Sequence, residues 1–486
     1  MWYDTNWTHR IKVTIQASEV DATLTDFAVF VDLSDLPAGF HSAVKSDGSD
    51  IRVTRADGST ECAREVVEYD ATGDKGELHF KANSISHTVD TDFYIYYGNA
   101  GASDYAVDAT YGRENVWSDF KGVWHFNEVP NGNIGSGSQI YRDATLNEND
   151  GEEGYYIDMD ASQSIDGIVG KALSFGEGID DHILVPDDNS LDFGTGSFTV
   201  TGMFQVDVGT TSRYQGIIKK ATGTMYTTYT GLQLGLWGNN EPMEDMQITA
   251  GVGDGSTVKK IIANNVSTYG ASDWHIVKLV VDRSDDTLHL YIDGVEHGSG
   301  IDISAVGSVS NASDLLFGFD LNRMDGNLDE MRVKASADSA DYASAEHVSL
   351  MTPGTFYDVG VEEDVPARTD TDDERDAEVS GSDDVTTDRG AEISGVDTNQ
   401  SDRDAEVSGV DTSQASRDAE VSGSLTDNSN RDALITGVDT DQTERNAEIA
   451  GELTDNNTRS AEIAGTDTDQ TERNAELSGA DTDQAS

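Results

Sequence analysis

Phe93-Tyr94-Ile95-Tyr96-Tyr97, followed directly by Gly98-Asn99, is the stretch that decides the fold class. Its aromatic and β-branched residues favour a strand, and the Gly-Asn pair favours a turn that ends it. The stretch Arg10-Ile11-Lys12-Val13-Thr14-Ile15 alternates apolar and polar residues in the same way. Helical periodicity is nearly absent from the first 357 residues, with one short candidate helix at 344–350. The chain is therefore predicted to be all-β.

Composition divides the 486 residues into a part that can build a core and a part that cannot. The aromatic residues stop at Tyr357, and the last proline is Pro366. A chain of this length has room for two or three domains. We predict β-sandwich, jelly-roll-like domains at 1–115 and 116–358, a linker at 359–374 and eight repeats at 375–486.

The chain carries 92 acidic and 31 basic side chains, which gives a formal net charge of −61. Such a polyanion repels phosphate groups, so we expect no nucleic acid and no anionic membrane as partner. Lysine is absent after Lys334, and this acidic, lysine-poor composition resembles that of proteins from extreme halophiles. In molar salt the Debye length is about 3 Å, which screens the repulsion within the chain. An ordinary acidic protein with a disordered tail is the alternative.

Cys62 is the only cysteine, so a disulfide within the chain is excluded. No run of about 18 apolar residues is present, which excludes a membrane-spanning helix. The N-terminal Met1-Trp2-Tyr3-Asp4 lacks the basic and apolar regions of a signal peptide. We therefore expect a chain without a signal peptide that is not exported by a general secretion route.

Three phrases of the first 115 residues carry a family resemblance. They are Trp7-Thr8-His9-Arg10, Asp50-Ile51-Arg52-Val53-Thr54-Arg55-Ala56-Asp57-Gly58 and Phe93-Tyr94-Ile95-Tyr96-Tyr97-Gly98-Asn99-Ala100. The region resembles an uncharacterised β-domain of prokaryotic surface proteins. In that family a joining phrase similar to Gly122-Val123-Trp124-His125-Phe126-Asn127-Glu128 leads into a second module. The resemblance implies a fold and no assigned chemistry.

Five phrases between residues 120 and 358 resemble a laminin-G-like, concanavalin A-type jelly roll. They are Gly170-Lys171-Ala172-Leu173-Ser174-Phe175, Ser190-Leu191-Asp192-Phe193-Gly194-Thr195-Gly196-Ser197-Phe198-Thr199-Val200, Asp273-Trp274-His275, Leu290-Tyr291-Ile292-Asp293-Gly294 and Gly326-Asn327-Leu328-Asp329-Glu330-Met331-Arg332-Val333. This fold hosts lectins, adhesion modules and structural spacers.

An arginine recurs every 14 residues in the C-terminal region, at positions 375, 389, 403, 417, 431, 445, 459 and 473. In the unit that begins at Arg403, the spacing of Ala405, Val407 and Val410 favours a short strand and a Gly turn over a coiled coil. One strand per unit buries too little surface alone, so the repeats must stack on each other or pair with identical chains. We favour an intertwined homotrimeric stalk over a single-chain solenoid.

Catalytic motifs are absent from the sequence: it holds no His-Glu-x-x-His helix, no Gly-x-Ser-x-Gly elbow and no phosphate-binding loop. Asp329-Glu330 is a weak glycosidase pair, because adjacent residues of a strand point to opposite faces. We therefore expect that the protein is not an enzyme.

A calcium site is predicted from the jelly-roll resemblance, because modules of this kind often hold Ca²⁺ at the rim of the sandwich. The resemblance assigns Asp180, Asp181 and Asp329 as ligands. Carboxylate and loop carbonyl oxygens suit this ion. The loop reads Phe175-Gly176-Glu177-Gly178-Ile179 where the family more often has Phe-Asp-Gly. Ordinary surface acids of a halophilic protein are the alternative.

Sugar binding requires an exposed aromatic ring beside hydrogen-bonding side chains. Leu232, Leu234 and Leu236 alternate onto one face of a predicted strand, which places the following Trp237 on the opposite face. The predicted glycan-binding residues are Trp237, Asn239, Asn240, Tyr226 and Tyr229. Aromatic residues with a purely structural role are the alternative.

These features together predict a virion structural protein of a haloarchaeal virus, a tail fibre, spike or turret that attaches to a host-surface glycan or glycoprotein. We expect it on the virion surface, with itself and other virion proteins as partners. A cellular surface or secreted lectin-like adhesin of a halophile is the alternative, and a carbohydrate-active enzyme is a third.

Overall fold

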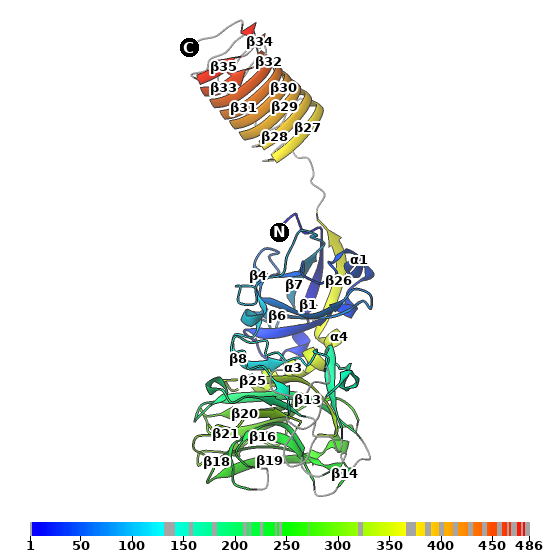
Figure 1. Cartoon of the computed structure of the whole chain (residues 1–486), viewed down its shortest axis with the longest axis vertical. Helices are drawn as coiled ribbons and strands as arrows, with labels where there is room; N and C mark the ends of the chain where they lie inside the picture. The colour runs from blue at the N-terminus through cyan, green and yellow to red at the C-terminus, as the bar shows by residue number, and fades with distance from the viewer. Residues whose placement is uncertain are drawn as a thin grey trace. The chain divides into compact units, whose positions relative to one another are not determined.

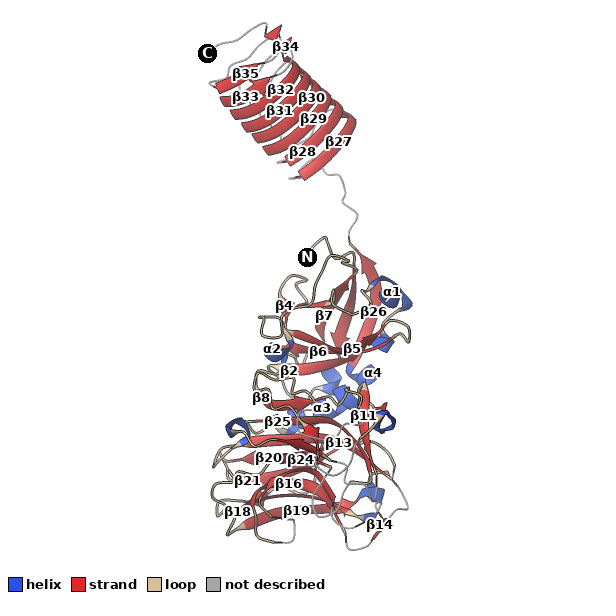
Figure 2. Cartoon of the chain, in the orientation of Figure 1, coloured by secondary structure: helices blue, strands red, loops and turns tan. Residues whose placement is uncertain are grey.

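The structure is a computed structural model, and it divides into two compact units, Met1–Val365 and Pro366–Ser486. It describes residues 2–130, 141–154, 159–176, 182–207, 211–212, 215–223, 227–238, 241–242, 245–270, 272–318 and 324–365, and the strands of the repeats. Strands dominate both units, which confirms the all-β prediction (Figure 2).

The N-terminal domain consists of a five-stranded and a three-stranded sheet (Figure 1). The two sheets enclose an apolar core. The five-stranded sheet has the order β26 (Tyr357–Asp364), β1 (His9–Ile15), β7 (Thr91–Tyr97), β3 (Arg52–Arg55), β4 (Glu61–Cys62). The three-stranded sheet has the order β2 (Phe27–Asp32), β6 (Lys75–Ala82), β5 (Arg64–Asp70). Two short helices, α1 (Ala38–Ala43) and α2 (Arg113–Val116), lie in its connections.

Strand β1 confirms the alternation read from the sequence. Ile11, Val13 and Ile15 are fully buried in the core, as expected for a strand with one face on the interior. β1 pairs on one side with β7 and on the other with β26, which opposes Tyr357 to Ile15. The chain thus returns to the N-terminal domain after the second domain, and β26 continues past the predicted boundary at residue 358.

The second domain, the jelly roll, packs a nine-stranded sheet on a seven-stranded sheet around the largest apolar core of the chain's described part. The first sheet contains β10 (Ser164–Asp166), β11 (Lys171–Phe175), β25 (Gly326–Lys334), β13 (Phe198–Val206), β20 (His275–Asp282), β21 (Thr287–Ile292) and β22 (Val295–Glu296), with β8 (Phe120–Trp124) beside β25 and β23 (Ile301–Asp302) beside β21. The second has the order β19 (Val258–Asn265), β18 (Gln247–Asp254), β16 (Thr230–Trp237), β15 (Gln215–Ala221), β24 (Leu315–Phe317), β12 (Ile183–Val185), β9 (Glu152–Glu153). A separate pair joins β14 (Thr211–Ser212) and β17 (Glu241–Pro242).

The nine-stranded sheet is covered on both faces. β20 is buried over seven successive residues, a pattern expected when a strand has protein on either side. One face packs on the jelly-roll core, and the other meets the N-terminal domain through a small cluster that includes Phe30, Met203 and Ile276. Helix α3 (Ala340–Met351), which contains the predicted helix at 344–350, contributes Tyr342 to the N-terminal core and Ala343 to the jelly-roll side. Helix α4 (Pro353–Phe356) then leads into β26.

Strand β25 contains a β-bulge at the interface between the domains. Thr201 of β13 pairs with Arg332 and Met203 pairs with Asp329, so Gly202 stands opposite two residues of β25. Glu330 has a φ of 47°, in the left-handed region. Leu328 and Met331 both lie in the jelly-roll core, and the two acids between them lie on the other side, toward the N-terminal domain. The prediction that Asp329 and Glu330 point to opposite faces is therefore wrong, because the bulge interrupts the alternation.

The repeats form strands that pair in parallel within one chain (Figure 1). Pairing joins equivalent positions of different units, such as Ala377 with Ala391 in successive units and Ala405 with Ala433 in alternate ones. The longer strands, such as β29, continue through the glycine of their repeat, and Gly395 pairs with Gly409 in the parallel ladder. The predicted turn at this glycine is therefore wrong. The strands are β27 (Asp376–Asp383), β28 (Gly390–Asp397), β29 (Arg403–Asp411), β30 (Arg417–Leu425), β31 (Arg431–Asp439), β32 (Arg445–Leu453), β33 (Arg459–Ile463), β34 (Thr466–Asp467), β35 (Asn474–Leu477) and β36 (Ala480–Asp481). Pairing within one chain is the arrangement expected for a single-chain solenoid. The homotrimeric stalk stays a prediction.

Within the described residues, no helix has the length and apolar character needed to cross a membrane.

Candidate functional site

Trp237 lies at the end of β16, on the sheet face turned away from the jelly-roll core. Leu232, Leu234 and Leu236 are buried in that core, which confirms their predicted alternation. Trp237 itself is half-buried. Nζ of Lys260, two strands away on β19, lies 4.5 Å from the centre of the Trp237 ring. The pair combines an aromatic surface with a charged hydrogen-bond donor.

Tyr229 does not belong to an exposed platform, and this corrects its prediction as a glycan contact. Only 1% of its surface is exposed. A Cβ atom on Gly251 would come within 2.6 Å of the Tyr229 hydroxyl and 3.0 Å of Cγ of Lys260. The absence of a side chain at Gly251 therefore lets Tyr229 pack on the sheet beneath Lys260. The other predicted contacts, Tyr226, Asn239 and Asn240, lie outside the described residues.

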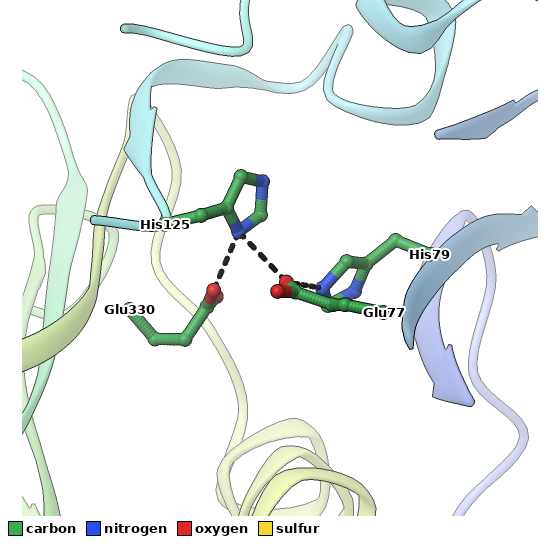
Figure 3. Close-up of side chains that lie close together, drawn as sticks. All are labelled: Glu77, His79, His125 and Glu330. Atoms are coloured by element: carbon green, nitrogen blue, oxygen red, sulfur yellow. Dashed lines mark hydrogen bonds and ion pairs between the residues drawn. The ribbon is translucent and has the colours of Figure 1, made fainter. Parts of the chain in front are cut away.

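A second group of polar side chains, which the sequence analysis did not identify, lies where the two domains meet (Figure 3). This interface cluster consists of Glu77, His79, His125 and Glu330, and all four residues are buried. Glu77 and His79 come from β6, while His125 directly follows β8 and Glu330 occupies the bulge of β25. The first two belong to the N-terminal domain and the last two to the jelly roll.

Short contacts connect the members of the interface cluster. Oε1 of Glu77 lies 2.8 Å from Nε2 of His79 and 3.3 Å from Nδ1 of His125. The same His125 nitrogen lies 2.5 Å from Oε1 of Glu330 (Figure 3). One carboxylate of the N-terminal domain thus faces an imidazole from each domain.

Further charged groups surround the cluster. Nε2 of His125 lies 3.3 Å from Oε2 of Glu65, which also accepts a 2.5 Å hydrogen bond from the Trp117 indole. Nε of Arg332 donates to Oε2 of Glu330 at 2.9 Å. Burial opposes the charging of His125, but the carboxylates of Glu330 and Glu65 outweigh it and raise its pKa well above the ordinary value.

Asp329, one of the three predicted calcium ligands, lies beside this cluster and is fully buried. Its Oδ2 atom is near Gly167, since a Cβ there would come within 2.5 Å. Burial, with the nearby charges of Glu330 and Glu77, raises the pKa of Asp329 well above its ordinary value. Asp180 and Asp181 lie outside the described residues, so the three-residue calcium site stays a prediction.

Two cavities flank the interface cluster. One, of about 340 Å³, is lined by Glu65, His125 and residues such as Arg64 and Arg142. The other, of about 390 Å³, is lined by Glu77, Gly167, Gly170 and the charged side chains of Lys75 and Lys171. Both open to the outside, and they approach the cluster from the His125 and Glu77 sides respectively.

One local signal of the cluster was present in the sequence. Glu77 and His79 are two apart on a strand, and this spacing places both side chains on one face. His125 lies in a phrase that the sequence analysis used only for the fold, and Glu330 was considered there as half of a weak glycosidase pair with Asp329. The pairing that joins all four residues is non-local.

Comparison with protein families matches two segments of the chain. Residues 176–342 match the concanavalin A-like lectin/glucanases superfamily, and residues 47–136 match a domain of unknown function, DUF2341. The first match agrees with the fold of the jelly roll. A search of curated proteins found no match.

Solved structures that match part of this chain include the binding domain of Paraclostridial Mosquitocidal Protein 1, at 15% identity and a TM-score of 0.35, covering 46% of this chain and 52% of that one. The receptor binding domain of botulinum neurotoxin C/D mosaic serotype is 13% identical with a TM-score of 0.35, covering 47% and 51%. Domain 4 of AbnA, an extracellular arabinanase of Geobacillus stearothermophilus solved with arabinotriose, is 17% identical with a TM-score of 0.30, covering 46% and 97%. The chain spans about half the length of the first two structures.

Proposed function

We propose that this chain is a surface-attachment protein whose jelly roll binds carbohydrate. The observation that supports this most directly is the half-buried Trp237 ring with the Lys260 ammonium 4.5 Å from its centre. An indole face stacks on the C–H groups of a sugar, and an ammonium donates hydrogen bonds to its hydroxyl or carboxylate oxygens. The fold alone does not decide the function, because jelly rolls of this type serve several roles.

We further propose that the protein is a tail fibre, spike or turret of a virus that infects a halophilic archaeon. The net charge of −61 suits molar salt, where repulsion is screened over a few ångströms. The 14-residue repeats suit a stalk that carries a binding domain, alone or as a homotrimer with other virion proteins. No catalytic step is proposed.

A lectin-like adhesin on the cell surface is the second candidate, and the likeness of the first 115 residues to a β-domain of prokaryotic surface proteins favours it. The genes next to the coding sequence separate the two candidates. Capsid and tail genes support the virion protein, whereas genes for secretion and cell-envelope proteins support the adhesin.

Carbohydrate binding is tested with the full chain on a glycan array and on host envelope glycoproteins, in about 3 M salt so that the acidic chain stays folded. Binding to a defined class of glycan supports the proposal. Failure to bind any glycan or envelope preparation, with the fold intact by circular dichroism, would point to a purely structural role.

A further inference from the structure

The interface cluster brings together two imidazoles and two carboxylates whose coordinating atoms all lie within 4.8 Å of one another. Two nitrogen and two oxygen donors are a set that Zn²⁺ and related transition-metal ions accept, whereas Ca²⁺ prefers oxygen alone. We infer that Glu77, His79, His125 and Glu330 bind one divalent transition-metal ion that joins the N-terminal domain to the jelly roll.

Glu77 and His79 are buried with part of their hydrogen-bonding capacity unused. Oε1 of Glu77 and Nε2 of His79 contact each other in the cluster, whereas Oε2 of Glu77 and Nδ1 of His79 have no hydrogen-bond partner among the described residues; the side chains are 1% and 0% exposed. A buried carboxylate without a full set of partners costs several kcal/mol. A metal ion bound to Glu77 compensates this cost.

The charge of the surrounding ion-pair network also fits a divalent cation. The network contains five carboxylates (Glu65, Glu77, Glu330, Asp338 and Glu346) and three permanent cations (Lys278, Arg332 and Lys334). With both imidazoles deprotonated, as metal binding requires, these groups carry a net charge of −2. One divalent ion neutralises it.

Outer contacts already hold two of the ligands in place. Nδ1 of His125 faces the cluster, and Nε2 on the other side of the ring lies 3.3 Å from Glu65. Glu330 directs Oε1 at the cluster, while Arg332 binds its Oε2. Carboxylate and guanidinium groups in such positions orient metal ligands and fix the imidazole tautomer.

Three separations between ligand atoms can be compared with those of a tetrahedral site. Metal bonds of about 2.0–2.2 Å place neighbouring ligand atoms roughly 3.3–3.6 Å apart. The separation of 3.3 Å between His125 and Glu77 already matches, whereas the hydrogen-bonded pairs, at 2.5 Å between His125 and Glu330 and 2.8 Å between His79 and Glu77, must open when the metal binds. Loss of the imidazole protons that now bridge these atoms accompanies metal binding. The two flanking cavities provide routes of entry.

The test uses the full chain, stripped with a chelator and dialysed against Zn²⁺ or Co²⁺ in high salt. With Zn²⁺ we expect one tightly bound ion per chain by inductively coupled plasma mass spectrometry, and a rise in melting temperature. With Co²⁺ we expect the intense visible absorption of the four-coordinate ion. His79→Gln should weaken zinc binding at least tenfold and remove the Co²⁺ bands. Glu77→Gln is the second variant if His79→Gln does not fold.

His9→Gln is the matched control, because His9 belongs to a partly exposed group with Glu362 and Asp364. This variant should retain the zinc and the Co²⁺ spectrum. The inference is overturned if the wild-type chain retains no zinc, if folded His79→Gln or Glu77→Gln retains it in full, or if His9→Gln loses it. If neither cluster variant folds, the Co²⁺ spectrum of the wild-type chain decides. A weak spectrum of the six-coordinate type overturns the inference. An intense four-coordinate spectrum that His9→Gln retains supports it.

Discussion

Nζ of Lys278 lies 2.6 Å from Oε2 of Glu346, a buried ion pair that ties strand β20 of the jelly roll to helix α3. Lys278 also contacts Asp338 at 2.7 Å, and all three side chains are at most 4% exposed. The helix contributes to the cores of both domains. The ion pair therefore belongs to the junction that makes residues 1–365 one compact unit.

Replacing Lys278 by Met should lower the free energy of unfolding by about 3–5 kcal/mol, because it leaves the buried carboxylates of Asp338 and Glu346 with one cation each, Lys334 and Arg332, in place of two. Urea denaturation at constant salt measures this. Lys75→Met is the matched control, since Lys75 and Asp166 form an exposed pair at 3.9 Å. That variant should change the value by less than about 1 kcal/mol. Equal losses in both variants would contradict a special role for the buried pair.

Lowering the salt concentration should destabilise the protein, because it exposes a net charge of −61 to its own repulsion. Melting curves in about 0.1 M and about 3 M salt measure the effect. The melting temperature should rise with salt. An unchanged value would contradict the halophilic interpretation.

The sequence predicted those parts of the fold that depend on local pattern. The alternation of apolar and polar residues identified β1 and the inward leucines of β16. A strand with one face on the core has an apolar residue at every second position. The return of the chain to pair β26 with β1 was not predicted, because nothing local in Tyr357–Asp364 specifies a partner near residue 10. The end of the jelly roll was predicted at residue 358 because the aromatic residues stop at Tyr357.

The candidate sites were predictable to different degrees. The position of Trp237 on the outer face of its sheet was predicted from the alternation of its strand. The burial of Tyr229 was not predicted, because it depends on Gly251 of another strand. The interface cluster depends on a bulge at Glu330 that interrupts the regular period. A pattern with a period of two cannot anticipate such an irregularity, so the side of the strand on which Asp329 and Glu330 lie was predicted wrongly.

The homotrimer predicts a sedimentation mass of three chains for the full protein. The triple substitution Ile393→Asp, Val407→Asp and Val421→Asp should reduce the mass to that of a monomer. It places a charge at an apolar position in each of three successive strands. Analytical ultracentrifugation measures the mass and circular dichroism the strand content. A wild-type monomer with β-type repeats would support the single-chain solenoid that the pairing of Ala377 with Ala391 describes.

The calcium prediction concerns Asp180, Asp181 and Asp329. If these residues bind Ca²⁺, its addition to chelator-treated protein should raise the melting temperature through preferential binding to the folded state. Asp181→Asn should abolish the response to Ca²⁺ and leave the response to Zn²⁺ intact. No response of the wild-type chain to Ca²⁺ would contradict the calcium prediction and leave Asp329 as a buried acid at the interface between the domains.

Trp237→Ala tests the central claim most directly, by measuring the affinity of the full chain for a host-surface glycan with and without the indole ring. The claim predicts a loss of about 1–3 kcal/mol in binding free energy, with the fold unchanged. Trp274→Ala is the matched control, because Trp274 is also half-buried but packs at the interface between the domains. It should leave the affinity unchanged. Glycan binding that survives Trp237→Ala at full strength would contradict the claim.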